Sequence, residues 1–119
     1  MEIRSYQDLR VWQMGMDLTV ELYRLTQSFP DHEKYGLTSQ IRRAATSVPA
    51  NIAERHARGS TEYSQFLTIA LGSLTELETH LIIAQRIGIL PSEQLDHLLT
   101  TTAQLGRMLN KLRAAIRKR

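Results

Sequence analysis

Apolar residues recur at helical spacing through the C-terminal half of the chain, and this periodicity constrains the fold more than any other feature. In two segments, residues 61–87 and 93–116, the steps between apolar positions alternate between three and four residues. The first stripe is Tyr63, Leu67, Ala70, Leu74, Leu77, Leu81 and Ala84. The second stripe is Leu95, Leu98, Thr102, Leu105, Leu109, Leu112 and Ile116. Such a 3.5-residue period favours left-handed helix packing at about 20°, the geometry of four-helix bundles.

Two further helices are predicted in the N-terminal half, at residues 6–28 and 37–58. Proline and glycine cluster in the connections, and the alternation typical of strands is rare. The last two connections are short, which makes neighbouring helices antiparallel. We therefore expect one all-α domain over residues 1–119, folded as an up-down-up-down four-helix bundle. The expected cap residues are Ser5 with Asp8, Ser60 or Thr61, Gly88 and Ser92.

The second helix contains a proline, Pro49, in its middle. Proline removes one helical hydrogen bond and clashes with the carbonyl four residues earlier, at a cost of about 3 kcal/mol. The apolar stripe nevertheless stays in phase on both sides, which favours one helix kinked at Pro49. The alternative is two short helices, with Ser47 capping the second. In the single kinked helix, Thr46 or Ser47 is expected to satisfy the freed backbone groups. The stripe is Leu37, Ile41, Ala44, Ala45, Val48 and Ile52.

The first two helices each have a second face that a single bundle core does not use. On the first helix this face is apolar, which leaves only a narrow polar strip and calls for more than one partner surface. On the second helix it consists of small residues, which allow close backbone approach. These faces predict a homo-oligomer, with closed symmetry as the usual solution. The faces are Leu9, Trp12, Met16, Val20 and Tyr23 on the first helix, and Ser39, Thr46, Ala50, Ala53 and Ala57 on the second.

Polar residues of the second helix are interpreted mainly as structural. Asn51 flanks the apolar stripe, so we expect it to be partly buried and hydrogen-bonded. Glu54 precedes Arg58 by four residues, a favourable helical pair. Arg42 and Arg43 point about 100° apart on a helix. One of them can therefore pair inside the assembly while the other faces water.

Charge is unevenly distributed along the chain, whose net charge is +3. No acidic residue follows Asp96, and the rest of the chain carries nine basic and twelve acidic residues. A basic terminal segment on a mildly acidic body indicates an anionic partner such as RNA or DNA. The alternative is a solvated helix end, where cations also favour the helix dipole. Candidate nucleic-acid-binding residues are Arg42, Arg43, Arg107, Lys111, Arg113, Arg117, Lys118 and Arg119.

The sequence lacks the usual patterns of catalytic and metal-binding sites. There is no cysteine, and none of the histidines, His32, His56, His80 and His97, has a carboxylate three residues before it. Glycine-rich phosphate loops and nucleophile elbows are absent. We expect neither enzymatic activity, nor a metal, nor a cofactor. The N-terminus shows no signal pattern and the apolar runs are short, so we expect a cytoplasmic protein without a membrane partner.

Three stretches of the chain carry a family resemblance: "YQDLRVWQMGMDL", "YGLTSQIRRAATSVPANIAE" and "EYSQFLTIALGSLTELETHL". Together they resemble the small bacterial four-helix-bundle proteins encoded in intervening sequences of 23S ribosomal RNA genes, over residues 6–90. The matching positions are Trp12, Tyr35, Gly36, Leu37, Gln40, Arg42, Arg43, Ala44, Pro49, Asn51, Ile52, Ala53, Glu54, Gly72, Ser73, Glu76 and Glu78. One departure is Arg55, where the family typically has glycine, and it predicts that the second helix extends toward Gly59.

The resemblance implies an antiparallel four-helix bundle that assembles as a homopentamer. A related branch supplies the accessory protein of diversity-generating retroelements, whose basic pentamer binds nucleic acid and a reverse transcriptase. The family as a whole has no established biochemical activity. Two hypotheses follow for this chain: an oligomer that binds RNA or DNA through its basic C-terminal segment, or a structural, scaffolding oligomer that binds another protein.

Overall fold

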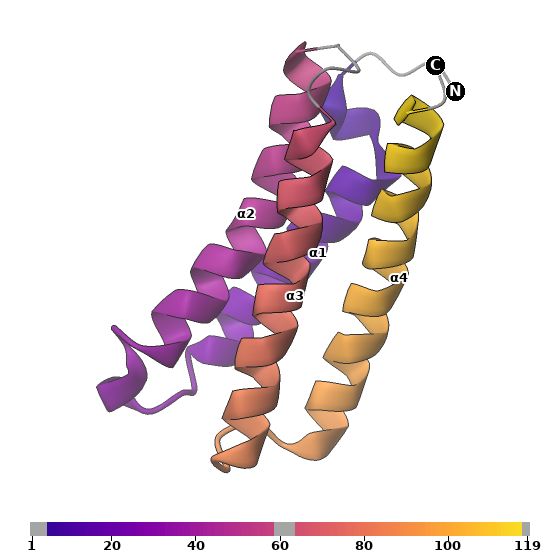
Figure 1. Ribbon diagram of the computed structural model, residues 1–119. Coiled ribbons are helices and arrows are strands. Elements are labelled where there is room, and N and C mark those ends of the chain that lie inside the picture. Colours follow the sequence, from indigo (N-terminus) through magenta and orange to yellow (C-terminus); the bar gives the residue numbers. More distant parts are fainter. Residues whose placement is uncertain (1–4, 59–63, 118–119) are drawn as a thin grey trace.

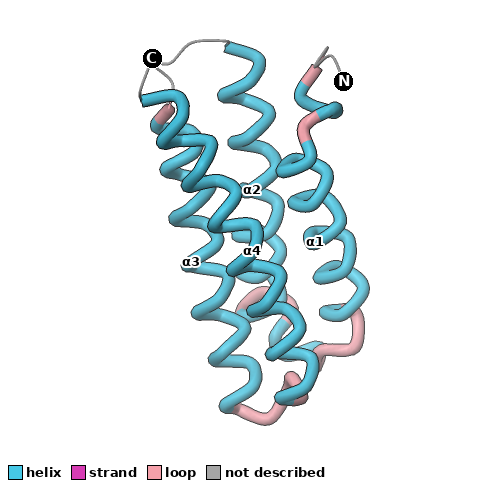
Figure 2. The backbone as a smooth tube through the Cα atoms, turned by 90° about the vertical axis from the view of Figure 1, so that its right-hand side faces the viewer, coloured by secondary structure: helices cyan, strands magenta, loops and turns pink. Residues whose placement is uncertain are grey.

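The computed structural model describes residues 5–58 and 64–117, without the side chains of Arg58 and Arg117. Four long helices and two short 3-10 helices, with no strand, make up the described residues, so the all-α prediction is confirmed. The helices are α1 (Arg10–Thr26), α2 (Leu37–Arg58), α3 (Gln65–Arg86) and α4 (Ser92–Arg117), with 3-10 helices η1 (Tyr6–Asp8) and η2 (Asp31–Glu33). They lie side by side in an elongated molecule of 46 × 25 × 19 Å (Figures 1 and 2).

Each helix packs mainly against its neighbours in sequence, and α1 also touches α4 over a smaller contact. In the contact between α3 and α4, residue numbers rise along one helix as they fall along the other. Along α3 and α4, for example, Thr68 meets Arg113 and Gln85 meets Ser92. Where α3 and α4 touch, these two helices therefore run in opposite directions, as their colours in Figure 1 also show.

The predicted apolar stripes form the core. Every member of the α2 stripe is buried, and so are the described members of the α3 stripe. On α4 the stripe is buried apart from Leu112, which is half-buried. Tyr63 lies outside the described residues. α3 is long and apolar enough by composition to cross a membrane. Here its leucines pack against α2 and α4, as in the core helix of a bundle.

The first predicted helix, 6–28, is two elements rather than one. The expected capping box between Ser5 and Asp8 is present, but it closes only the 3-10 turn η1. Leu9 then adopts an extended backbone, with φ −75° and ψ 125°, and α1 starts at Arg10. This break turns η1 back, so that the Tyr6 ring meets the Trp12 ring edge-on at 5.3 Å.

The second helix runs without interruption through Pro49. Pro49 has no amide hydrogen, so the carbonyl of Ala45, four residues earlier, loses its helical donor. The hydroxyl of Thr19 on α1 lies 3.1 Å from that carbonyl oxygen and 2.8 Å from the carbonyl of Gly15, and it donates between them. The expectation that Thr46 or Ser47 would serve this carbonyl is wrong, because the donor comes from the neighbouring helix.

Gly15 of α1 faces Pro49 of α2. A Cβ at Gly15 would lie 3.5 Å from the Pro49 ring, an ordinary van der Waals contact, so the space between them would be filled by a single methyl group. Pro49 is buried there, next to a residue with no side chain. Gly15 of α1 therefore lies next to Pro49, the residue of α2 that has no amide hydrogen.

Two helix ends in the second half illustrate local capping. Gly88 adopts φ 84°, and the amides of Ile89 and Gly88 donate to Ala84 and Gln85, which closes α3 as predicted. Ser92 is not the N-cap of α4, because the carbonyl of Pro91 already accepts from the Leu95 amide. The predicted caps at residues 60 and 61 lie outside the described residues, and α3 is described from Gln65.

Candidate functional site

Arg42 is held firmly at the end of α1. Its Nε donates to the hydroxyl of Thr26 at 2.9 Å, and its Nη2 donates to the carbonyl of Tyr23 at 3.2 Å. The guanidinium also lies over the Tyr23 ring, 4.6 Å from the centroid. A cation at the last turn of a helix is favoured by the helix dipole. Arg42 therefore joins α2 to α1, whereas its neighbour Arg43 is exposed.

A cleft of about 660 Å³ opens beside Arg42, between the end of α1, the loop before α2 and the first turns of α2. The loop is fixed because the carboxylate of Glu33 accepts from the Leu37 amide at 3.1 Å. The Tyr35 side chain, carried by this loop, is 88% exposed. The lining residues are Tyr23, Lys34, Tyr35, Thr38, Ser39, Arg42, Arg43, Thr46 and Ser47.

A polar seam joins α2 to α3 next to this cleft. The hydroxyl of Ser73 donates to the hydroxyl of Ser47 at 2.8 Å, and the amide of Asn51 donates to the carbonyl and hydroxyl of Ser47 at 2.8 and 3.0 Å. Arg43 and Glu76 line a small pocket of about 100 Å³ beside the two serines. Asn51 is thus partly buried and hydrogen-bonded, as expected, and it supports helix packing.

The last turns of α4 carry the other predicted cations. Arg107 and Lys111 are exposed and border a shallow cleft of about 720 Å³. Arg113 is half-buried and donates to the hydroxyl of Thr68 at 3.2 Å and to the side chain of Asn110 at 3.0 Å. Arg117 ends α4, but its side chain lies outside the described part of the chain, as do Lys118 and Arg119.

The predicted cations whose side chains the structure describes, Arg42, Arg43, Arg107, Lys111 and Arg113, do not form one patch within a chain. Arg42 and Arg43 belong to the first turns of α2, where α1 ends. Arg107, Lys111 and Arg113 belong to the last turns of α4, which lie at the opposite end of the bundle (Figure 1). Sequence position alone could not separate the two groups, because their separation follows from the direction in which the helices pack.

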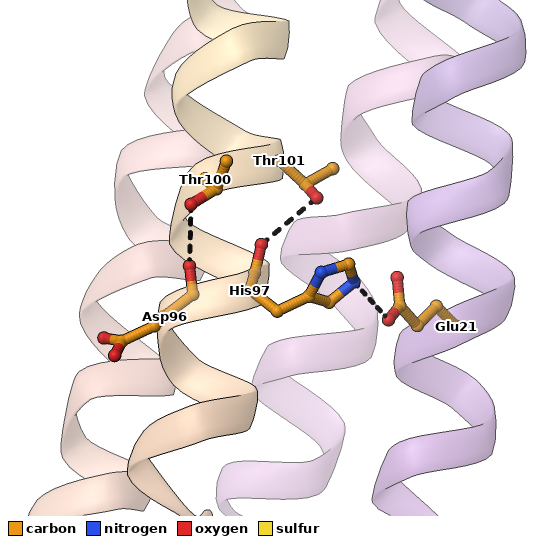
Figure 3. A network of polar contacts seen from close by, with 5 residues as sticks. All are labelled: Glu21, Asp96, His97, Thr100 and Thr101. Carbon is orange, nitrogen blue, oxygen red and sulfur yellow. Dashed lines mark hydrogen bonds and ion pairs between the residues drawn. The ribbon is translucent and has the colours of Figure 1, made fainter.

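Histidines make isolated contacts with single carboxylates. His97 Nε2 lies 2.9 Å from Glu21 Oε2, and Figure 3 shows the imidazole reaching from α4 across to α1. His80 lies 3.5 Å from Glu76 on the same helix. No group of three or more histidine, aspartate or glutamate side chains that could hold a metal occurs in residues 5–58 and 64–117. Glu78 accepts from the buried Thr102 hydroxyl at 2.6 Å, so this carboxylate has a packing role.

Sequence reasoning missed the aromatic side of the α1–α2 cleft. The apolar pattern places Tyr23 on the second face of the first helix and gives Tyr35 no contact role, but both side chains are exposed at this cleft. Lys34 Nζ lies 5.5 Å from the Tyr35 centroid. A usable signal was present, since Tyr35 lies in the loop that precedes Gly36, away from any helical stripe. A loop aromatic beside a lysine is a candidate contact residue.

These elements define a small all-α protein in which several polar contacts join one helix to another. Residues 7–111 match the protein family described as "23S rRNA-intervening sequence protein", so the chain belongs to that family. A solved structure from Bacteroides thetaiotaomicron, a protein with unknown function from the S23 ribosomal protein family, is similar in fold with a TM-score of 0.76. That protein is 22% identical, and the match covers 87% of this chain and 97% of its own. None of the curated proteins matches this chain.

Proposed function

We propose that this chain is a non-enzymatic, cytoplasmic protein that binds RNA or DNA through its basic C-terminal segment. The carrying observation is the exposure of Arg107 and Lys111 on the last turns of α4, in a segment with no acidic residue after Asp96. Exposed cations attract phosphate, and the release of counterions makes binding depend steeply on salt.

The proposal includes a homo-oligomer. Its protomer is an antiparallel bundle with α2 kinked at Pro49, and the pentamer is the assembly that the family resemblance implies. Met16 and Val20 on α1 are 37% and 43% exposed, and the small residues Ala50 and Ala57 of α2 are exposed as well. Packing between copies would cover these faces. Symmetry would then repeat the α4 cations around the assembly.

Charge-neutralising variants test the proposal better than truncation. A chain that ends at residue 110 would lose Ile116, which is only 3% exposed and belongs to the core. The double variant Arg107→Gln/Lys111→Gln removes two exposed cations and leaves the core intact. The matched control is Arg24→Gln/Arg86→Gln, because both arginines are exposed and lie on other helices.

The expected result is weaker binding of single-stranded RNA by the α4 variant only. Each lost phosphate contact lowers the slope of log affinity against log salt by about 0.7. The α4 variant should therefore show a slope smaller by about 1.4 or more, measured by fluorescence anisotropy. Equal binding by the two variants, or wild-type binding that does not respond to salt, would contradict the proposal.

A second candidate function is protein binding by a structural, scaffolding oligomer. It is favoured by three exposed isoleucines on the outer side of α3 and its end, Ile69, Ile83 and Ile87. Ile83 and Ile87 lie one helical turn apart at the end of α3, and exposed apolar patches mark interaction sites. Capture of one specific protein that Ile83→Lys abolishes, with no RNA binding at about 50 mM salt, would favour this function over the first.

A further inference from the structure

The cleft between α1 and the start of α2 presents cations that form no ion pair. Lys34, Arg42 and Arg43 all line it, and its lining includes no carboxylate. Within residues 5–58 and 64–117, none of the three makes a salt bridge. Arg42 is fixed by Thr26 and Tyr23, so its charge is positioned in advance at the wall of the cleft.

Tyr35 gives the same cleft an aromatic surface. Its side chain is 88% exposed, although burial of a tyrosine ring is ordinarily favourable. Lys34 Nζ lies over the ring, 5.5 Å from its centroid, and therefore occupies one of its two faces. The other face is free to stack on a flat group. Stacking of bases on aromatic side chains tolerates any sequence, because every base has a π-face.

We propose that this cleft binds one nucleotide unit, with the base stacked on Tyr35 and the phosphate held by Lys34 and Arg43. The inference rests on the proposed nucleic-acid function but adds a second contact site, at the opposite end of the bundle from the α4 cations. The unit belongs either to a single strand of RNA or DNA or to a free mononucleotide, which present the same base and phosphate.

Size and composition favour a nucleotide over an acidic side chain of another protein. A volume of about 660 Å³ falls within the range of small-molecule sites, well beyond the space of one carboxylate. Hydroxyl groups of residues such as Ser39 add donors and acceptors to the lining. An acidic side chain would use the cations but would leave the exposed Tyr35 ring without a partner.

The test compares three probes on the intact protein: an oligouridine octanucleotide, its abasic counterpart with the same phosphates, and uridine monophosphate. The variants are Tyr35→Leu and Tyr35→Phe, the latter keeping the stacking ring. Because Tyr35 is so exposed, neither replacement removes core packing. Binding of the two oligomers is measured by fluorescence anisotropy at low salt. Occupancy by the mononucleotide is followed by fluorine NMR of protein that carries fluorotyrosine at its four tyrosines.

The expected result is that Tyr35→Leu weakens octanucleotide binding by about five-fold or more, while Tyr35→Phe keeps wild-type affinity. The abasic oligomer should bind more weakly and should not distinguish the variants. Arg43→Gln should weaken both oligomers. The fluorine signal of Tyr35 is the one that is missing from Tyr35→Phe. Uridine monophosphate should shift this signal in the wild-type protein.

Several outcomes would overturn the inference. The first is equal affinity of Tyr35→Leu and wild-type protein for the octanucleotide. The second is a Tyr35 fluorine signal that uridine monophosphate leaves unchanged, which would also result if a neighbouring copy covered the cleft. If Arg107→Gln/Lys111→Gln weakens binding while Tyr35→Leu does not, the C-terminal function stands and the cleft fails. If the mononucleotide shifts Tyr35 but the α4 variant binds like wild type, the C-terminal function fails and the cleft stands.

Discussion

At the scale of single residues, the α1–α2 contact depends on side chains that supply what the neighbouring helix lacks. Thr19 donates to the carbonyl that Pro49 leaves without an amide, and Arg42 bonds the last turn of α1. Helical periodicity identified the buried stripe of α2 correctly. It could not identify Thr19, because a hydroxyl that serves another helix follows from the pairing register and not from the repeat within its own helix.

Replacing Thr19 with valine should destabilise the protein by about 1 kcal/mol, because the Ala45 carbonyl loses its donor while the shape is nearly preserved. The measurement is the free energy of unfolding from urea titration. Thr75→Val is the matched control, since the Thr75 hydroxyl is exposed and bonds only within α3. In a Pro49→Ala background, the restored amide serves the carbonyl, so the cost of Thr19→Val should shrink. An unchanged cost there would rule out this role of Thr19.

Arg42 and Arg43 should separate in a stability experiment. Arg42→Gln removes two hydrogen bonds to α1 and should lower the free energy of unfolding by about 1 kcal/mol. Arg43→Gln should change it by less than about 0.5 kcal/mol, because the side chain is exposed. Urea unfolding at one protein concentration provides the comparison. Equal losses in both variants would mean that Arg42 does not join the helices.

At the scale of elements, helix existence was predictable and the first helix boundary was not. The stripes of α2, α3 and α4 repeat over many residues, so their buried faces follow from spacing. The break at Leu9 occurs together with the Tyr6–Trp12 contact, and both fall within one predicted helix, where periodicity gives no sign of them. The exposed Tyr35 was missed for a related reason, because no periodic pattern covers the loop that carries it.

Two glycines should respond in opposite ways to alanine. Gly72 lies inside α3 with open space where a Cβ would be, so Gly72→Ala should stabilise the protein by about 0.5–1 kcal/mol. Gly88 has φ 84°, so Gly88→Ala should destabilise it by about 1 kcal/mol or more. Thermal and urea unfolding measure both. A destabilising Gly72→Ala would instead place a close neighbour against that side of α3.

At the scale of the whole molecule, the distribution of apolar and basic residues suits assembly better than isolation. α1 exposes Met16 and Val20, and α2 exposes small residues such as Ala50, whereas the basic turns of α4 lie at one end of the bundle. The sequence pointed to both features. It could not show that Arg42 and Arg43 lie away from the α4 cations, because the packing direction of the helices decides that.

Introducing charge on the α1 face should break the proposed oligomer. Met16→Glu/Val20→Glu places like charges at the surface proposed to pack between copies, where a buried unpaired charge is strongly unfavourable. The expected mass by light scattering falls to that of a 13.6 kDa protomer. Ile83→Glu/Ile87→Glu is the control for another exposed apolar pair, at the C-terminal end of α3. A wild-type protein that already scatters as a protomer at micromolar concentration would refute the assembly.

The contact between Gly15 and Pro49 also favours one register of α1 against α2 over a shifted register. If α1 slid along α2 by one turn, about 5.4 Å, Val11 or Thr19 would stand against the proline ring in place of glycine. The Ala45 carbonyl would lose its hydroxyl donor in the same movement. A misaligned hairpin thus carries both a steric and a hydrogen-bonding penalty. The apolar stripe alone would tolerate a shift by one turn, so this contact is what disfavours the shifted alignment.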